Sequence, residues 1–600
     1  MLHFYKKLDG TMVVFIIGFF ALLFGYFPGR VLIEFFPLKS KEKFVVSFGV
    51  TFFIYYLIGF FVYIANLPLY FLYTLLILLF IAISLLTYKK YKPFPNEFTF
   101  LGIFMGVFIV ILSYQGLLPY YAGGQWYFDW FEHFQRVRFF LEQLPLDTRI
   151  GPYLITARPP LFNVVTYVYQ SVIGKEFWEY QIMATLLNTT VLLACWLIIT
   201  LFTKRSLTFL LMVLSAALLL NPSFIIQTTF TWTKALSVYY LLTGFYFYLQ
   251  FRQGKSPLYL FLGTSLLGAA YLTHYSTAPF IFGIGCDWLL QAVRTPKLFL
   301  KQFGVSMIIF VVILSSWYFW AISHYGLYQS FMGNTAYEWQ RQITPKERVI
   351  KDITNLKNTL VPTVPQAYIR LVEQQDNYLV ALYDILYGFY ATKLVGNLTV
   401  TLTVIIFVYS IVQFRRQHLL NSRQIKSIRP GNLRRVAANI LEQPNTCWWW
   451  FLFVGIILGL IAIPSRDLLG FAHVAFLPIS FLLICFATVS LIYFSEKKRL
   501  FLSVFVIVGM LVEAVIGIGL RLYVSRHDLN PAYLIEMGRA DQATKLLPEH
   551  SANYVLKTTQ QLNFLADQFS SAQTLFLCVV IAGMGLSWLF LVNSFFIRRR

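Results

Sequence analysis

The sequence predicts an all-α protein that crosses a lipid bilayer many times. Of its 600 residues, 58% are hydrophobic and 12% are charged, which is too little charge for the surface of a soluble protein of this size. Apolar runs of roughly 17 to 25 residues, the length that a helix needs to cross a bilayer, recur along the chain. A helix in lipid satisfies its own backbone hydrogen bonds, so we expect a helical bundle.

The apolar runs predict about fifteen transmembrane helices. The expected spans are 12–27, 44–64, 68–87, 97–115, 178–202, 206–220, 228–250, 256–272, 276–291, 302–324, 394–413, 447–463, 471–494, 501–524 and 573–597. Residues 153–173 are apolar but interrupted by two prolines, which favours interfacial helices lying along the membrane. We treat the first run as a retained helix rather than a cleaved signal peptide, with a re-entrant segment broken at Pro28-Gly29 as the alternative.

Four segments follow from this pattern. They are 1–96 with additional N-terminal helices, 97–413 with outer loops 116–177 and 325–393, 414–446 as a basic cytoplasmic loop, and 447–600 with outer loop 525–572.

The excess of basic residues, 48 against 26 acidic ones, would suggest a nucleic-acid partner in a soluble protein. Here most of it lies in short connectors, which is the positive-inside pattern of a multi-pass protein of the plasma (inner) membrane and argues against a nucleic-acid partner. The basic connectors are Lys89–Lys92, Lys204–Arg205, Arg252–Lys255, Arg415–Arg435, Lys497–Arg499 and Arg598–Arg600. The three long loops then lie outside, where a site can be built.

Nucleotide and metal motifs are missing from the sequence. There is no Walker-type loop, no strand followed by GxGxxG and no HExxH, and the five cysteines have no metal-ligand spacing. We therefore predict no cofactor and no cytosolic nucleotide-sugar donor. The outer loops contain no Asp-x-Asp pair, but a divalent metal is not excluded.

The segment 123–138 carries the richest set of reactive side chains. In a helix that starts near Asp129, the i, i+4 spacing places Asp129 and His133 on one face with Arg136 beside it. A carboxylate can take the proton from an acceptor hydroxyl, while histidine and arginine can bind a phosphate. The alternative is helix capping by Asp129 among interfacial aromatic and charged residues.

Further candidates follow at other outer positions. Arg158 precedes two prolines, which hold it away from helical geometry, and Lys234 and His274-Tyr275 lie at outer helix ends. For these the alternatives are a turn residue, snorkelling of the lysine and a structural histidine. Arg466 lies in an outer turn where it has Asp467 to pair with, and Asp147 is a possible second carboxylate or a helix cap.

These motifs together resemble polytopic glycosyltransferases of the GT-C fold, such as lipid-A aminoarabinose transferases and protein O-mannosyltransferases. The resemblance rests on Asp129-Trp130-x-x-His133 after a span, Arg158-Pro159-Pro160-Leu161, Trp232-Thr233-Lys234 and His274-Tyr275. It covers 97–413 and is only generic in the last third. The three spans before residue 97 depart from the simplest members, where the acidic loop follows the first span.

The resemblance implies transfer of a sugar from a polyprenyl-phosphate carrier to a hydroxyl of a glycan, lipid or protein acceptor, with inversion at the anomeric carbon and usually without a metal. Asp129 would be the base. Donor binding would fall to His133, Arg136, Arg158, Lys234, His274, Tyr275 and Arg466. Two alternatives are a polymerase or ligase that uses a lipid-diphosphate donor and a transporter or flippase without chemistry. Such a transporter would usually carry charge inside the membrane, where Asp287 and Glu513 are the main candidates.

Overall fold

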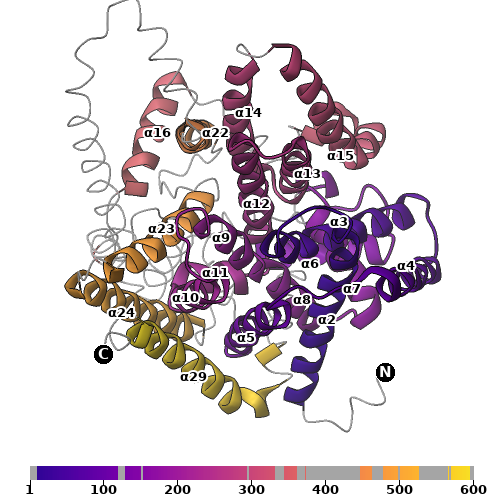
Figure 1. Ribbon diagram of the computed structural model, residues 1–600. Helices are drawn as coiled ribbons and strands as arrows, with labels where there is room; N and C mark the ends of the chain where they lie inside the picture. Colours follow the sequence, from indigo (N-terminus) through magenta and orange to yellow (C-terminus); the bar gives the residue numbers. More distant parts are fainter. Residues whose placement is uncertain are drawn as a thin grey trace, which may run out of the picture.

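The protein is a bundle of helices in the computed structural model (Figure 1). The structure describes residues 10–118, 129–150, 153–292, 296–331, 344–360, 372, 446–462, 477–496, 500–525, 565–566 and 569–594. Within these residues the only extended pairing is one isolated bridge between Ile150 and Tyr153. The prediction of an all-α protein is therefore confirmed.

The first half of the chain contains most of the packed helices. They are α2 (Gly10–Ile33), α3 (Ser40–Ile64), α4 (Leu69–Lys90), α5 (Glu97–Gly116), α6 (Asp129–Leu141), η2 (Ile155–Ala157), α7 (Leu161–Ile173), α8 (Phe177–Thr189), α9 (Val191–Ile199), α10 (Leu207–Leu219), α11 (Pro222–Thr229), α12 (Lys234–Arg252), α13 (Pro257–Thr273), η3 (Tyr275–Thr277) and α14 (Ala278–Ala292). The remaining helices are α15 (Pro296–Phe331), α16 (Pro345–Leu360), α21 (Thr446–Trp449), η6 (Trp450–Val454), α22 (Gly455–Ala462), α23 (Leu477–Glu496), α24 (Leu500–Ser525), η9 (Ser570–Ala572) and α29 (Gln573–Val592).

The structure has a helix at each predicted span except 394–413, which lies outside the described residues. Eight helices in the described part are long and apolar enough to cross a membrane, or nine if the bent pair α10 and α11 is one span. The predicted number is larger because several helices fall short of the 18 residues required; α14, for example, has 15. The apolar runs that predicted a membrane protein thus form helices, and eight of those described are long enough to cross a membrane.

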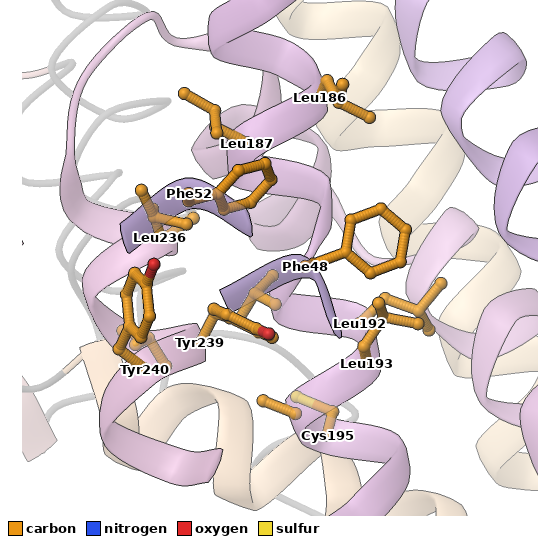
Figure 2. Close-up of a cluster of buried hydrophobic side chains, with 14 of the residues drawn as sticks. Phe48, Phe52, Leu186, Leu187, Leu192, Leu193, Cys195, Leu236, Tyr239 and Tyr240 are labelled. Atoms are coloured by element: carbon orange, nitrogen blue, oxygen red, sulfur yellow. The ribbon is translucent and has the colours of Figure 1, made fainter. Parts of the chain in front are cut away.

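The centre of the bundle lies where α3, α8, α9 and α12 meet. Figure 2 shows Phe48 and Phe52 of α3 among side chains of the other three helices, all of them buried. The hydroxyl group of Tyr239 on α12 donates to the carbonyl of Val45 at 2.6 Å. The N-terminal helices are thus part of the same core as the helices that follow residue 97.

One end of the bundle, here called the connector end, collects the short basic connectors. Arg30 at the end of α2 pairs with Glu97 at the start of α5 through an Nε–Oε1 distance of 2.8 Å. Arg252 at the end of α12 likewise lies 3.0 Å from a carboxylate oxygen of Asp287 on α14. Each pair therefore joins the ends of two helices at this end of the bundle.

The opposite end, here called the site end, collects the predicted outer segments. Gln143, just after α6, donates to the carbonyl of Leu67 at 2.8 Å. Thr156 of η2 donates to the carbonyl of Gln329 near the end of α15 at 3.3 Å. The described parts of the outer loops 116–177 and 325–393 therefore contact each other at this end.

The first helix shows no break at Pro28-Gly29, contrary to one of the two possibilities above. Helix α2 continues to Ile33, and the Gly29 N–H donates to Thr51 Oγ1 at 2.7 Å. A side chain at Gly29 would overlap the Ser47 carbonyl. Glycine lets α2 and α3 approach closely, so the hydrogen bond to α3 supports the helix beyond the proline.

The structure adds detail to two further predicted elements. The span predicted at 206–220 is α10, and a second short helix, α11, turns away from it by 84°. Asn221 caps α11, accepting a hydrogen bond from the Phe224 N–H at 3.0 Å, and Pro222 takes its first position.

Helix α7, which we predicted to lie along the membrane, is buried from Leu161 to Gln170 because α3, α6 and α8 cover it.

Candidate active site

Helix α6 carries a buried ion cluster centred on Glu132. Arg136, one turn later, donates to Glu132 Oε1 from Nε at 3.0 Å and from Nη2 at 2.7 Å. Its third nitrogen, Nη1, donates to the carbonyl of Ile155 at 2.6 Å. Arg136 is fully buried and binds protein through all three nitrogens. In this arrangement Arg136 positions Glu132 and the η2 backbone, and its phosphate contact stays a prediction.

Arg158 joins the same carboxylate from the other side. Its backbone is extended, with φ −132° and ψ 139°, as the following proline favours. Its Nη2 lies 3.5 Å from Glu132 Oε2 and its Nη1 lies 3.4 Å from the Tyr275 hydroxyl. The side chain keeps 13% of its surface exposed, so Arg158, unlike Arg136, remains accessible to a ligand.

The two arginines control the protonation of Glu132. Burial alone would raise the pKa of this carboxyl group, but Arg158 and Arg136 outweigh burial and lower the pKa to about 2. Glu132 is therefore ionised at any physiological pH. As a carboxylate fixed by two cations, it is a poor proton acceptor and a good anchor.

His133 contacts α7 rather than the arginines. Its Nδ1 lies 3.1 Å from Asn163 Oδ1, and since a carbonyl oxygen only accepts, Nδ1 carries the proton in this arrangement. Burial lowers the pKa of His133 to about 3, so the ring is neutral near pH 7. A neutral imidazole can hydrogen-bond a ligand through Nε2 but adds no positive charge for a phosphate.

His274 and Tyr275 lie at the turn where α13 ends. The backbone N–H of Ser276 donates to His274 Nδ1 at 3.1 Å, which leaves Nε2 as the ring nitrogen that carries a proton in the neutral form. The two rings stack at 4.6 Å, and Tyr275 contacts Arg158 as described above. Segments 117 residues apart in the chain therefore meet at one point.

Lys234 is the first residue of α12, six residues after the predicted start of this span at 228. Its Nζ lies 3.5 Å from the centre of the Trp232 ring, and the side chain is buried. Helix α12 contacts η3, and because α12 and α13 run antiparallel, the Lys234 end of α12 is the end beside η3. A third basic residue thus lies at the end of the bundle that holds Arg158 and His274.

Asn188 of α8 holds the turn that presents Lys234. Its Nδ2 donates to the Trp232 carbonyl at 2.9 Å, and its Oδ1 accepts from the Leu236 N–H at 3.2 Å. Tyr180, also on α8, donates to the Thr231 carbonyl at 2.8 Å. These bonds fix both sides of the turn 230–233, so the position of Lys234 depends on α8.

The remaining predicted residues fall into two groups. Asp129 is the first residue of α6, but its side chain lies outside the described part of the structure, as does the whole of Arg466. Asp147 is described and exposed, in the turn after α6, and forms no ion pair with a described residue. The structure therefore does not bring Asp147 into the cluster, and Glu132 is the carboxylate that lies there.

Three residues of the site, Glu132, Asn163 and Asn188, were not predicted from the sequence. Glu132 stands four residues before Arg136, a spacing typical of an exposed helix pair, and nothing in the sequence showed that Arg158 would share it. Asn163 and Asn188 are single amides inside apolar runs. A buried polar residue in such a run signals a specific hydrogen bond, but does not reveal the partner.

The arrangement can bind and stabilise an anion beside a carboxylate. Arg158, Lys234 and His274 offer fixed N–H groups at one end of an apolar bundle, and α6 begins there with Asp129. Preorganised donors of this kind stabilise negative charge that develops during a reaction. Within the described residues, no three His, Cys, Asp or Glu side chains are grouped to hold a metal ion.

Comparison with known proteins gives one similar structure. No family model matches the chain, and no curated protein does. The chain is similar to a crystal structure of ArnT from Cupriavidus metallidurans bound to undecaprenyl phosphate, with 14% identity and a TM-score of 0.41 over 84% of this chain and 79% of that one. A TM-score this low does not establish a shared fold, so function must be argued from the residues of the site.

Proposed function

We propose that this protein is a membrane glycosyltransferase that moves a sugar from a polyprenyl-phosphate carrier to an acceptor hydroxyl on the extracytoplasmic side. The observation that carries the proposal is the contact between Arg158 and Tyr275 near the start of α6, whose first residue is Asp129. Glu132 holds Arg158 in this position. Lys234 and His274 lie at the same end. Basic residues at the outer end are contrary to the positive-inside pattern. Membrane topology therefore does not explain their presence, whereas binding of an anionic donor does.

In the proposed reaction, the Asp129 carboxylate takes the proton of the acceptor hydroxyl. The oxygen then forms a bond to the anomeric carbon while the bond from that carbon to the phosphate oxygen breaks, and the polyprenyl phosphate leaves with the electron pair. A single displacement inverts the anomeric configuration. Arg158 and Lys234 offset the negative charge of the leaving phosphate, and the His274 Nε2–H donates a hydrogen bond to it. The apolar helices accommodate the lipid tail.

The sidedness follows from the separation of the two ends. The connector end carries short basic loops such as Arg252–Lys255, and the described parts of the long loops 116–177 and 325–393 lie at the site end. The positive-inside rule puts the connector end in the cytoplasm of a plasma-membrane protein. The acceptor, whether glycan, lipid or protein, is then met outside.

Asp129→Asn tests the proposal directly. We expect this variant to fold as the parent does and to lose about 10²- to 10⁴-fold in transfer rate, which is the contribution of general-base catalysis. The assay follows a labelled sugar from polyprenyl-phosphate donors into cell-envelope acceptors. The matched control is Glu142→Gln, at an exposed carboxylate just after α6, and it should transfer normally.

Near-normal activity of Asp129→Asn would reject Asp129 as the base. The same assay run with lipid-diphosphate donors separates the proposal from a polymerase or ligase, since the phosphate that leaves differs. Uptake of labelled lipid-linked sugar into proteoliposomes without any product would instead indicate a transporter.

A further inference from the structure

Three buried glutamines lie on three helices that contact one another beside the cluster already described. Gln115 lies in the last turn of α5, Gln181 in the second turn of α8 and Gln227 in the last turn of α11. All three side chains are buried, and α5, α8 and α11 each contact the other two. We call this three-helix meeting point the amide junction.

Gln115 is costly to bury in this bundle. It has no exposed surface, and neither Oε1 nor Nε2 has a hydrogen-bond partner among the described residues. An amide that leaves water without forming other hydrogen bonds lowers the stability of the fold. A leucine would fit an apolar helix at lower cost, so the amide points to a ligand that supplies the missing hydrogen bonds.

The surroundings of the junction show what such a ligand would be. Arg521 of α24 donates from Nη1 to Thr229 Oγ1 at 2.6 Å, two residues beyond Gln227. Its guanidinium lies 5.8 Å from the ring of Tyr114, the neighbour of Gln115. Amides both donate and accept, as hydroxyl groups do, while a fixed guanidinium repels an ammonium group. The ligand best matched is rich in hydroxyls and carries no positive charge.

The junction also adjoins the candidate active site. Helix α11 ends at Thr229, and four residues later Lys234 begins α12. Phe134 of α6 contacts the ring of Tyr180, the neighbour of Gln181, at 5.4 Å. A group bound at the junction would therefore lie close to both the cation side and the α6 side of the active site.

We propose that the amide junction binds the sugar of the donor, and that this sugar is uncharged rather than an amino sugar. The inference rests on the proposed function, since it assumes a polyprenyl-phosphate carrier. It assigns the phosphate to Arg158, Lys234 and His274, and the sugar hydroxyls to Gln115, Gln181 and Gln227.

The test measures binding rather than transfer. Purified protein is titrated with undecaprenyl phosphate, with undecaprenyl-phosphate-linked glucose and with the corresponding 4-amino sugar. We expect Gln115→Leu to weaken binding of the glucose-bearing lipid about tenfold, which is about 1.4 kcal/mol, and to leave binding of bare undecaprenyl phosphate within about twofold. The parent should prefer the glucose-bearing lipid over the amino sugar.

Gln250→Leu is the matched control. Gln250 is a buried glutamine on α12 near the connector end, bonded to Gln253, and its replacement should change neither affinity. Gln181→Leu and Gln227→Leu repeat the test if Gln115→Leu does not elute as a single folded species. Equal losses for both lipids, or no loss in any of the three variants, would overturn the inference. Failure of the parent to bind bare undecaprenyl phosphate would instead overturn the proposed function.

Discussion

At the scale of single residues, Glu132 decides how the active site is arranged. One carboxylate holds Arg136, which is sealed inside the protein, and Arg158, which is partly open. The sequence places Glu132 and Arg136 on one helix face, but Arg158 comes from a different segment. Burial distinguishes the two arginines, and burial depends on the packing of α6 against α7 and η2.

Glu132→Gln should destabilise the protein by about 3 to 5 kcal/mol, because it leaves two arginines without their charged partner inside the bundle. Glu142→Gln, which breaks the Arg138–Glu142 pair on the exposed side of the same helix, should cost less than about 1 kcal/mol. Both pairs are four residues apart on α6. The apparent melting temperature in detergent compares them, and equal effects would contradict the buried role of Glu132.

The same pair of variants gives a pH dependence with a definite sign. The pKa of Glu132 is lowered from its ordinary value of 4.5 to about 2. The stability that Glu132 supplies is therefore complete above about pH 4.5 and is lost as the pH falls toward 2. Glu132→Gln should remove this part of the acid destabilisation, whereas Glu142→Gln should keep it.

At the scale of elements, the turn 230–233 and the bent pair α10 and α11 position Lys234. The apolar run predicted a span that starts at 228, whereas α12 begins at Lys234 and residues 222–229 form α11. The 84° bend was not predicted, although Asn221-Pro222 is a typical helix start, because an apolar length says nothing of direction. Asn188 was not predicted either, since its partners are backbone groups more than 40 residues away.

Asn188→Leu should raise the KM for the donor about tenfold or more while the protein remains folded. The substitution keeps the volume but removes the bonds to the Trp232 carbonyl and the Leu236 N–H, so the turn and Lys234 lose their support. Thr189→Val is the control, because Thr189 is equally buried and bonds only to Thr185 within its own helix. Donor titrations of both variants make the comparison, and an unchanged KM in Asn188→Leu would show that these bonds do not position Lys234.

At the scale of the whole molecule, the bundle separates stability from chemistry. The positions of the helices follow from apolar length, which the sequence displays directly, and the alternation of connectors follows from charge. The contacts between side chains far apart in the chain cannot be predicted in this way, because they depend on which helices pack together. The connector end is closed by ion pairs such as Arg30 with Glu97, and the site end keeps Arg158 accessible.

Glu97→Gln tests this separation. Glu97 accepts from Arg30 and from the hydroxyl of Tyr26 at 2.7 Å, so its neutral analogue should lower the apparent melting temperature through a loss of about 3 to 5 kcal/mol. Transfer measured well below that temperature should keep the parental KM and kcat. A large change in KM would show that the two ends are coupled.

The sharing of one carboxylate by two arginines has a consequence for turnover. The carboxylate of Glu132 offsets one of the two positive charges of Arg136 and Arg158, so one positive charge remains. Lys234 adds a second. A sugar-bearing phosphodiester has one negative charge, whereas the released monoester carries about 1.5 to 2. The spent carrier should thus be held more tightly than the fresh one, and its departure should limit the steady-state rate. Rapid-mixing experiments would then show a burst of product in the first turnover, and a strictly linear start would contradict this order of steps.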